Sequence, residues 1–101
     1  MGNSIVTSSN ETDIDQRVKI EIYSTEFCPY CTRARMLLDS KGVSYTEFRV
    51  DLDAALRSEM ESRSNRTSVP QIFIGDKHIG GFDELAELEI VEELDSMLGL
   101  N

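Results

Sequence analysis

A chain of 101 residues with a formal net charge of −9 accommodates one small domain. The excess of Asp and Glu excludes a nucleic-acid surface, because binding phosphates requires a basic patch. No apolar run approaches the ~18 residues needed to span a membrane. The first residues lack the basic and apolar segments of a secretory signal, so we expect a cytoplasmic protein.

Residues 1–17 are rich in Ser, Thr, Asn and Asp and show no sustained periodicity. Such a composition buries too little apolar surface to offset the loss of chain entropy, so we expect a disordered extension. Residues 18–101 are the expected folded domain.

Both cysteines of the chain lie in one motif, Cys28-Pro29-Tyr30-Cys31, which follows a predicted strand over residues 18–23. A helix predicted from Pro29 places Cys28 at its start, where the N–H groups of Tyr30 and Cys31 stabilise an anionic sulfur. Residues three apart share one helix face, so the two sulfur atoms can meet. A thiolate beside a second thiol is what reversible disulfide exchange requires. The motif therefore indicates redox chemistry, with Cys28 as nucleophile and Cys31 as resolving thiol.

The next residues continue the alternation of helices and strands. The first helix should end near Lys41, with Gly42 as its left-handed cap. Residues 43–50 predict a second strand. Asp53 is the expected N-cap of a second helix, which should fade in the polar stretch 62–66.

Two further strands and a last helix complete the domain. Pro70 precedes a predicted strand over residues 71–74, and a turn leads to a short strand over residues 77–79. After Gly80-Gly81, apolar residues, Val91 among them, recur at helical spacing in the stretch 82–98, where they should face the sheet. The order β-α-β-α-β-β-α predicts an α/β fold with a four-stranded mixed sheet flanked by helices.

Three motifs in this order carry a family resemblance: the C-x-x-C pair, Ser68-Val69-Pro70 before the third strand, and Gly80-Gly81-Phe82-Asp83 before the last helix. With them, the stretch 18–98 resembles the glutaredoxins, in particular the short dithiol forms of bacteria. The resemblance implies a thioredoxin-like fold and a monomeric enzyme that reduces glutathione mixed disulfides and protein disulfides. It implies glutathione as co-substrate, no tightly bound cofactor, and glutathionylated or disulfide-bonded proteins as partners. Ribonucleotide reductase is one partner that the family suggests.

The resemblance also implies a glutathione site beside the cysteines. The Val69–Pro70 bond is expected to be cis, with the backbone of Val69 pairing with the cysteinyl part of glutathione. Asp83 would face the γ-glutamyl ammonium group, and Arg66, or as a second choice Arg35, the glycyl carboxylate. Without a ligand role, Asp83 would be a first-turn helix residue and Arg66 a solvated cation. The expected binding residues are Thr25, Tyr30, Arg66, Ser68, Val69, Pro70, Gly81, Phe82 and Asp83.

Two departures from the family pattern bear on the chemistry and the fold. Thr25 stands where many members have Lys, a cation that would stabilise the thiolate. A Gly that is frequent near the position of Glu92 is absent, so we expect a more continuous last helix.

Other functions stay open at this point. A structural zinc site needs about four ligands, and the only further strong donor is His78, which we expect to be an exposed hairpin residue. An iron–sulfur cluster carrier on the same fold would ligate the cluster through Cys28 of two subunits. Pro29 argues against it, since such members mainly have Gly or Ser there. A glutathione-independent reductase, supplied by thioredoxin reductase, would lack glutathione-binding residues such as Asp83.

Overall fold

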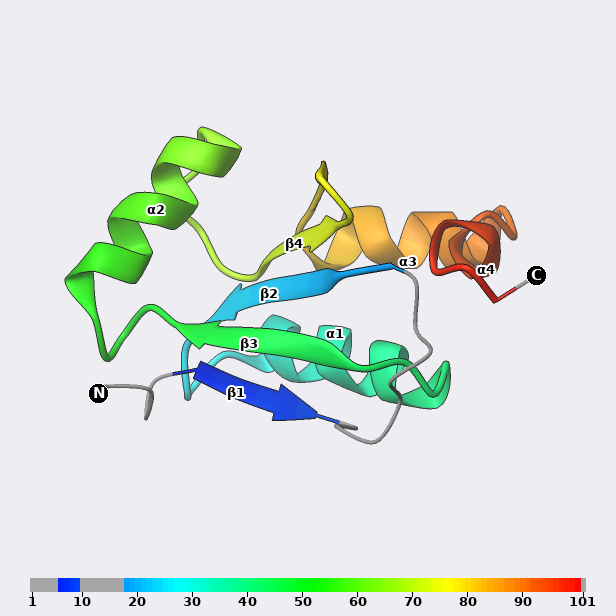
Figure 1. Cartoon of the computed structure of the whole chain (residues 1–101), viewed down its shortest axis with the longest axis horizontal. Helices are drawn as coiled ribbons and strands as arrows, with labels where there is room; N and C mark the ends of the chain where they lie inside the picture. The colour runs from blue at the N-terminus through cyan, green and yellow to red at the C-terminus, as the bar shows by residue number, and fades with distance from the viewer. Residues whose placement is uncertain (1–5, 10–17, 101) are drawn as a thin grey trace.

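The computed structural model describes residues 6–9 and 18–100, which form a five-stranded sheet with helices on both faces (Figure 1). From the second strand onward, the elements follow the predicted order. None of the described helices is long and apolar enough to cross a membrane. The strands lie side by side in the order β1-β3-β2-β4-β5, and their bounds are β1 Val6–Ser9, β2 Ile20–Ser24, β3 Tyr45–Arg49, β4 Gln71–Ile74 and β5 Lys77–Gly80. The helices are α1 Pro29–Ser40, α2 Ala54–Ser64, α3 Phe82–Ile90 and α4 Leu94–Met97.

The sheet has one strand more than predicted. β1 pairs antiparallel with β3, with Val6 opposite Phe48 and Ser9 opposite Tyr45. The expectation that residues 1–17 lack regular structure is therefore wrong for residues 6–9, while 1–5 and 10–17 lie outside the described residues. Four residues carry too short an alternation to be separated from a loop by pattern. These residues become a strand because β3 has a free edge whose N–H and C=O groups can pair, and a sequence pattern does not show this.

Alternating side chains of the central strand fill two separate cores. Ile20 and Ile22 of β2 belong to a cluster shared with α1, α3 and α4. Tyr23 belongs to a smaller cluster under α2, which includes Met60 of that helix. Neighbouring side chains on a strand point to opposite faces, so one strand supports both helical layers.

Capping residues set the helix ends as predicted. The Asp53 carboxylate accepts a hydrogen bond from the N–H of Ala55 at 2.8 Å and caps α2. Gly42 follows the end of α1 with a left-handed φ of +72°. α2 runs to Ser64 and ends at Asn65 in the left-handed region, within the polar stretch 62–66 where it was expected to fade.

The topology brings several connections to one edge of the sheet. β3 is parallel to β2, β4 is antiparallel to β2, and β5 is antiparallel to β4. β2, β3 and β5 therefore end at the same edge, and α1, α2 and α3 each begin there (Figure 1). β4 starts at this edge. Cys28 before α1, Pro70 before β4 and Gly81 before α3 therefore all lie at the same edge.

The last helix is interrupted, which corrects the expectation of a more continuous one. Glu92 separates α3 from α4 and has a left-handed φ of +64°. The N–H of Glu93 donates to the Leu88 carbonyl at 2.8 Å, one of the two bonds of a Schellman turn. Val91, which was expected to face the sheet, is exposed beside this turn. The turn thus forms with Glu92 at a position where the positive φ favours glycine.

This conformation predicts that Glu92→Gly stabilises the protein by about 1 kcal/mol, because glycine adopts a positive φ without steric cost. The measurement is the free energy of unfolding in urea at neutral pH. Glu87→Gly, within α3, is the matched control and should lower that free energy by about 1 kcal/mol. A loss of stability in both variants would contradict the prediction.

Candidate active site

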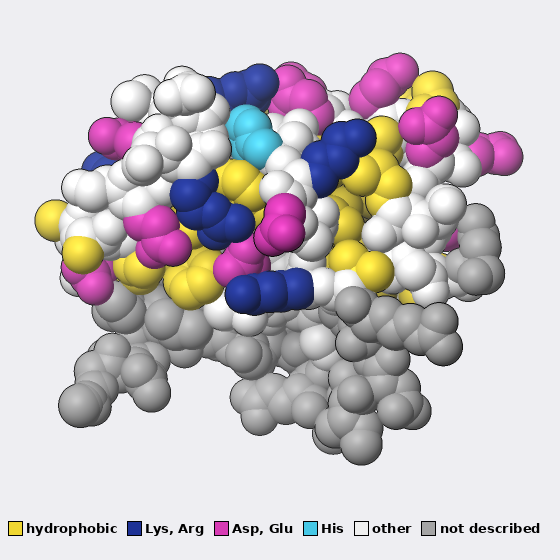
Figure 2. All heavy atoms as spheres, turned by 45° about the horizontal axis from the view of Figure 1, so that its top comes forward, with side chains coloured by type: hydrophobic (Ala, Val, Ile, Leu, Met, Phe, Trp, Pro, Cys, Tyr) yellow, Lys and Arg dark blue, Asp and Glu magenta, His cyan; other side chains and the backbone are white. Residues whose placement is uncertain are grey.

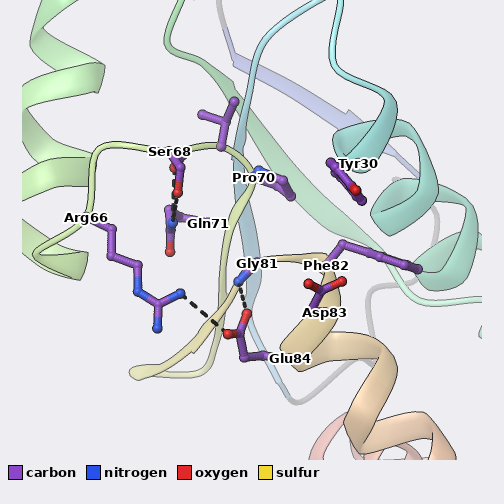
Figure 3. Close-up of a pocket in the computed structure, with 10 residues that line it drawn as sticks. Tyr30, Arg66, Ser68, Pro70, Gln71, Gly81, Phe82, Asp83 and Glu84 are labelled. Atoms are coloured by element: carbon purple, nitrogen blue, oxygen red, sulfur yellow. Dashed lines mark hydrogen bonds and ion pairs between the residues drawn. The ribbon is translucent and has the colours of Figure 1, made fainter.

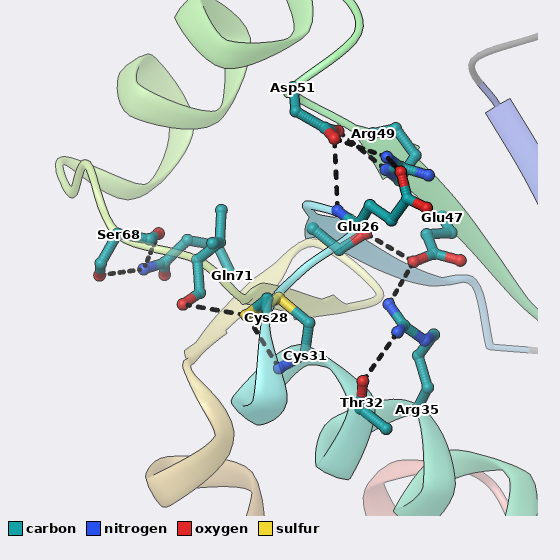
Figure 4. Close-up of a disulfide and its surroundings, with 12 residues drawn as sticks. Glu26, Cys28, Cys31, Thr32, Arg35, Glu47, Arg49, Asp51, Ser68 and Gln71 are labelled. Carbon is teal, nitrogen blue, oxygen red and sulfur yellow. Dashed lines mark hydrogen bonds and ion pairs between the residues drawn. A yellow bond between two sulfur atoms is a disulfide. The ribbon is translucent and has the colours of Figure 1, made fainter.

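The two cysteines form a disulfide at the start of α1 (Figure 4). Cys28 is the N-cap residue, and the N–H of Cys31 donates to its Sγ at 3.1 Å. Of the two N–H donors expected, from Tyr30 and Cys31, the structure pairs that of Cys31 with the sulfur. Cys31 is buried, whereas Cys28 is partly exposed. This difference in exposure suits an attacking thiol and a resolving thiol.

The loop before β4 lies beside the disulfide. The carbonyl oxygen of Val69 is 4.0 Å from the Cys28 Sγ. The Val69–Pro70 bond is cis, as expected. Pro70 is buried and Ser68 is exposed, so the loop presents its polar part to solvent next to the sulfur atoms.

A buried side chain that the sequence analysis missed holds this loop. Gln71 is 0% exposed and donates through Nε2 to the Ser68 carbonyl at 3.0 Å and to its Oγ at 3.3 Å. Its Oε1 lies 2.7 Å from Nε2 of His78. A polar residue at the head of an otherwise apolar strand was the available signal. Gln71 thereby links the loop to the β4–β5 hairpin.

The expectation of an exposed His78 is wrong. Strand pairing places it opposite Phe73, with ring centres 4.9 Å apart, and its side chain is half-buried. Burial lowers the pKa of His78, with a smaller contribution from Arg66, so the ring is neutral at pH 7. Within the described part of the chain, no group of three or more His, Cys, Asp or Glu residues is placed to hold a metal ion.

A pocket of about 310 Å³ opens between the Pro70 loop and the start of α3 (Figure 3). All the expected binding residues except Thr25 line it. Thr25 lies on the connection between β2 and Cys28. The pocket also includes Gln71 and Glu84, which were not predicted. Its lining is Tyr30, Arg66, Ser68, Val69, Pro70, Gln71, Gly81, Phe82, Asp83 and Glu84.

Charges of both signs face this pocket. Glu84 accepts a hydrogen bond from the Gly81 N–H at 2.8 Å and lies 3.7 Å from the Arg66 guanidinium. The bond from Gly81 holds the pKa of Glu84 below its usual range, so the carboxylate is ionised at pH 7. Its place in the first turn of the helix after Gly81 is a capping-box signal that could have identified it. Asp83 is exposed in that same turn. Figure 2 shows basic and acidic side chains intermingled on the face it presents, without a continuous basic stripe.

Two glycines lie at positions where a side chain would be crowded. A Cβ on Gly81 would lie 3.3 Å from the Pro70 carbonyl oxygen. Gly80 has a φ of +119°, and a Cβ there would lie 2.8 Å from the Glu84 carboxylate. A larger residue at Gly81 would press against the Pro70 loop, and one at Gly80 would displace the Glu84 side chain and hold a strained positive φ.

Aromatic rings join the starts of α1 and α3. The ring centres of Tyr30 and Phe82 are 6.5 Å apart. The guanidinium of Arg33 lies 5.2 Å from the Tyr30 ring centre. Tyr30 is 53% exposed, so its ring forms one wall of the pocket and remains accessible.

Ion pairs lie on the opposite side of the disulfide (Figure 4). Arg49 pairs with Asp51 and with Glu26. The hydrogen bond from Arg49 holds the pKa of Asp51 below its usual range, and the Asp51 carboxylate also accepts the N–H of Glu26 at 3.3 Å. Arg35, the second choice for a carboxylate ligand, is paired with Glu47 and lies outside the pocket lining.

Three comparisons with known proteins agree with one another. Residues 20–79 match the family model described as Glutaredoxin. Glutaredoxin 3 of Escherichia coli (strain K12) is 56% identical over 79 residues, which cover 78% of this chain and 95% of that protein. The crystal structure of a buckwheat glutaredoxin–glutathione complex aligns with a TM-score of 0.74 at 31% identity, over 79% of this chain and 76% of that one. The solution structure of glutaredoxin from Brucella melitensis aligns with a TM-score of 0.72 at 45% identity, over 81% of this chain and 89% of that one. These neighbours confirm the predicted thioredoxin-like fold.

The contacts of Gln71 predict that Gln71→Leu destabilises the protein by about 1–3 kcal/mol, because His78 and Ser68 lose their buried partner. Urea denaturation measures this effect. Ser68→Ala removes only the longer of the two Ser68 contacts and should change the free energy of unfolding by less than about 0.5 kcal/mol. Equal stability of Gln71→Leu and the unmodified chain would argue against a supporting role for the amide.

Proposed function

Since this chain belongs to the glutaredoxin family and is a thiol–disulfide oxidoreductase, we propose that it takes electrons from glutathione bound in the pocket beside Cys28. The observation that carries the proposal is the position of the pocket. Val69, which lines it, has its carbonyl oxygen 4.0 Å from the Cys28 sulfur. A tripeptide bound there can present its own sulfur to Cys28.

The charges of the pocket complement those of glutathione, which has two carboxylates and one ammonium group. Arg66 is the proposed partner of the glycyl carboxylate, and Asp83 that of the γ-glutamyl ammonium group. The free N–H groups at the start of α3 suit the γ-glutamyl carboxylate. The backbone of Val69 would pair with the cysteinyl residue like a short added strand. Ser68, Pro70, Gly81, Phe82 and Tyr30 form the surrounding walls.

Two effects stabilise the attacking thiolate. The dipole of α1 contributes about 0.3–2 kcal/mol. A hydrogen bond to a charged group contributes about 1.5–3 kcal/mol, and the N–H of Cys31 already donates to the Cys28 sulfur. Over most of these ranges the hydrogen bond contributes more than the dipole. Thr25 offers a hydroxyl in place of the cation found in many relatives.

The proposed reaction with a glutathionylated protein has two exchanges. The Cys28 thiolate attacks the glutathione sulfur, the mixed disulfide breaks, and the protein sulfur leaves with the electron pair and takes up a proton. A second glutathione thiolate then attacks the glutathione on Cys28. This step releases glutathione disulfide and restores the Cys28 thiolate.

With a protein disulfide, the proposed route uses both cysteines. Cys28 first forms a mixed disulfide with one protein sulfur, and the other protein sulfur leaves as a thiolate. The Cys31 thiolate then attacks the Cys28 sulfur and releases the reduced protein. The product is the Cys28–Cys31 disulfide seen in the structure, which two glutathione molecules reduce to the dithiol.

We further propose a cytoplasmic monomer whose protein partners are glutathionylated or disulfide-bonded proteins, with ribonucleotide reductase as one candidate. In a reducing compartment, a lone C-x-x-C pair serves catalysis better than structural cross-linking.

The experiment that tests the function is reduction of the mixed disulfide of glutathione and 2-mercaptoethanol, coupled to glutathione reductase and NADPH. We expect Cys31→Ser to keep most of the turnover, since this route needs only Cys28, and Cys28→Ser to lose at least about 10³-fold, as expected when the covalent nucleophile is removed. Asp83→Asn should raise the KM for glutathione by roughly tenfold, through loss of a charge-assisted contact. Absence of turnover in the unmodified chain would overturn the proposal.

A further inference from the structure

A second hollow, of about 380 Å³, lies next to the pocket, between α1 and α3. Its apolar walls come from both helices, and we refer to it as the α1–α3 groove. Arg33 and Glu89 are its charged lining residues. The apolar lining consists of Met36, Leu37, Phe82, Ala86 and Ile90.

Two side chains of the groove are unusually exposed for their type. Met36 is 64% exposed and Ile90 is 73% exposed. Neither is among the buried or partly buried residues of the two core clusters. Adjacent exposed apolar side chains that line a concave surface mark a contact site for another molecule.

The groove is continuous with the reacting centre. Phe82 lines both the pocket and the groove, and its ring meets that of Tyr30, two residues after Cys28. Both helices begin at the edge of the sheet that carries the disulfide, so the groove leads away from it. Lys41, at the far end of α1, bridges Glu89 and Asp95 at 2.6 and 2.8 Å and ties the helices together there.

We propose that the α1–α3 groove binds an apolar stretch of the protein whose sulfur exchanges at Cys28. The inference rests on the proposed function, in which such a protein is bonded to Cys28 or to the glutathione beside it. Glutathione occupies the pocket, so the groove is the adjoining apolar surface that a tethered protein can reach. From Phe82 to Ile90 the helix rises about 12 Å, which matches three or four residues of extended chain at ~3.3 Å each.

The charges around the groove favour uncharged apolar side chains in it. Glu89 is paired with Lys41, and the guanidinium of Arg33 lies over the Tyr30 ring. Met36 and Ile90, on facing helices, would then cover the inserted side chains. Burial of the inserted apolar side chains, rather than an ion pair, is the expected source of selectivity for the bound protein.

Two synthetic peptides test this inference. Each carries one cysteine joined by a disulfide to 2-nitro-5-thiobenzoate, followed by leucines in one peptide and by serines in the other. In the reduced Cys31→Ser chain, the Cys28 thiolate attacks the peptide sulfur, and nitrothiobenzoate leaves with the electron pair and reports the rate by its colour. We expect the leucine peptide to react roughly tenfold faster, as for apolar groups entering an apolar site. Met36→Ser combined with Ile90→Ser should abolish the preference without changing Tm.

Matched controls separate the groove from other effects. Leu100→Ser removes an exposed apolar side chain outside the groove and should leave the preference intact. The rate with 5,5′-dithiobis(2-nitrobenzoate) reports the intrinsic reactivity of Cys28 and should be equal in all variants. Equal rates for the two peptides, or a preference that survives the double substitution, would overturn the inference.

A second copy of this chain is the competing occupant. If sedimentation velocity finds a dimer that the double substitution dissociates, the groove is an interface between copies and the proposal is wrong. The peptide assay contains no glutathione. Its failure is therefore distinguishable from a failure of glutathione-dependent turnover.

Discussion

The parallel course of β2 and β5 is the constraint on which the site depends. Because these strands end at the same edge of the sheet, the helices that follow them, α1 and α3, start side by side. Their N-cap residues are Cys28 and Gly81. The Pro70 loop reaches the same edge, since β4 begins there. The reactive sulfur, the pocket and the α1–α3 groove all arise from these two neighbouring helix starts.

Polar contacts near the site, one set buried at Gln71 and one exposed at Glu84, keep this edge in one arrangement. Gln71 holds the loop that carries Val69, and Glu84 holds Gly81 and faces Arg66. Each amide or carboxylate bridges two segments that are separate in the sequence. For the buried Gln71 amide, removal of one partner is costly, because the remaining group is left without a hydrogen bond. The pocket therefore owes its shape to side chains that need not touch a ligand.

Features with local causes could be predicted from the sequence. Proline after Cys28, Asp53 before a helix and the alternation that starts at Val18 each act through neighbouring residues. Each predicted element formed, with the strand expected over residues 18–23 found at Ile20–Ser24. The motif residues of the resemblance, such as Ser68 and Asp83, line one pocket because the strands adjoining them pair.

Features that depend on distant segments could not be predicted in this way. The role of Gln71 requires the β4–β5 hairpin to bring His78 to the amide, which also holds Ser68 in the preceding loop. The turn at Glu92 is fixed by the backbone bond to Leu88, although its own side chain does not favour a positive φ. β1 exists through pairing with β3, on the far side of the sheet from β5. For Gln71 and β1 the deciding contact lies outside the sequence window that a pattern can use. The turn at Glu92 is closed locally, but the residue at its left-handed position is not the glycine by which such a turn is identified.

The pairing of β1 also determines how the sheet meets other molecules. Without it, β3 would be a terminal strand whose unpaired N–H and C=O groups offer a template for another chain. With it, the sheet ends on both sides in strands of only four residues, Val6–Ser9 and Lys77–Gly80. Short terminal strands offer few backbone groups with which a strand of another molecule could pair. Residues 6–9 thus cover the edge of β3 and leave a shorter strand at the border of the sheet.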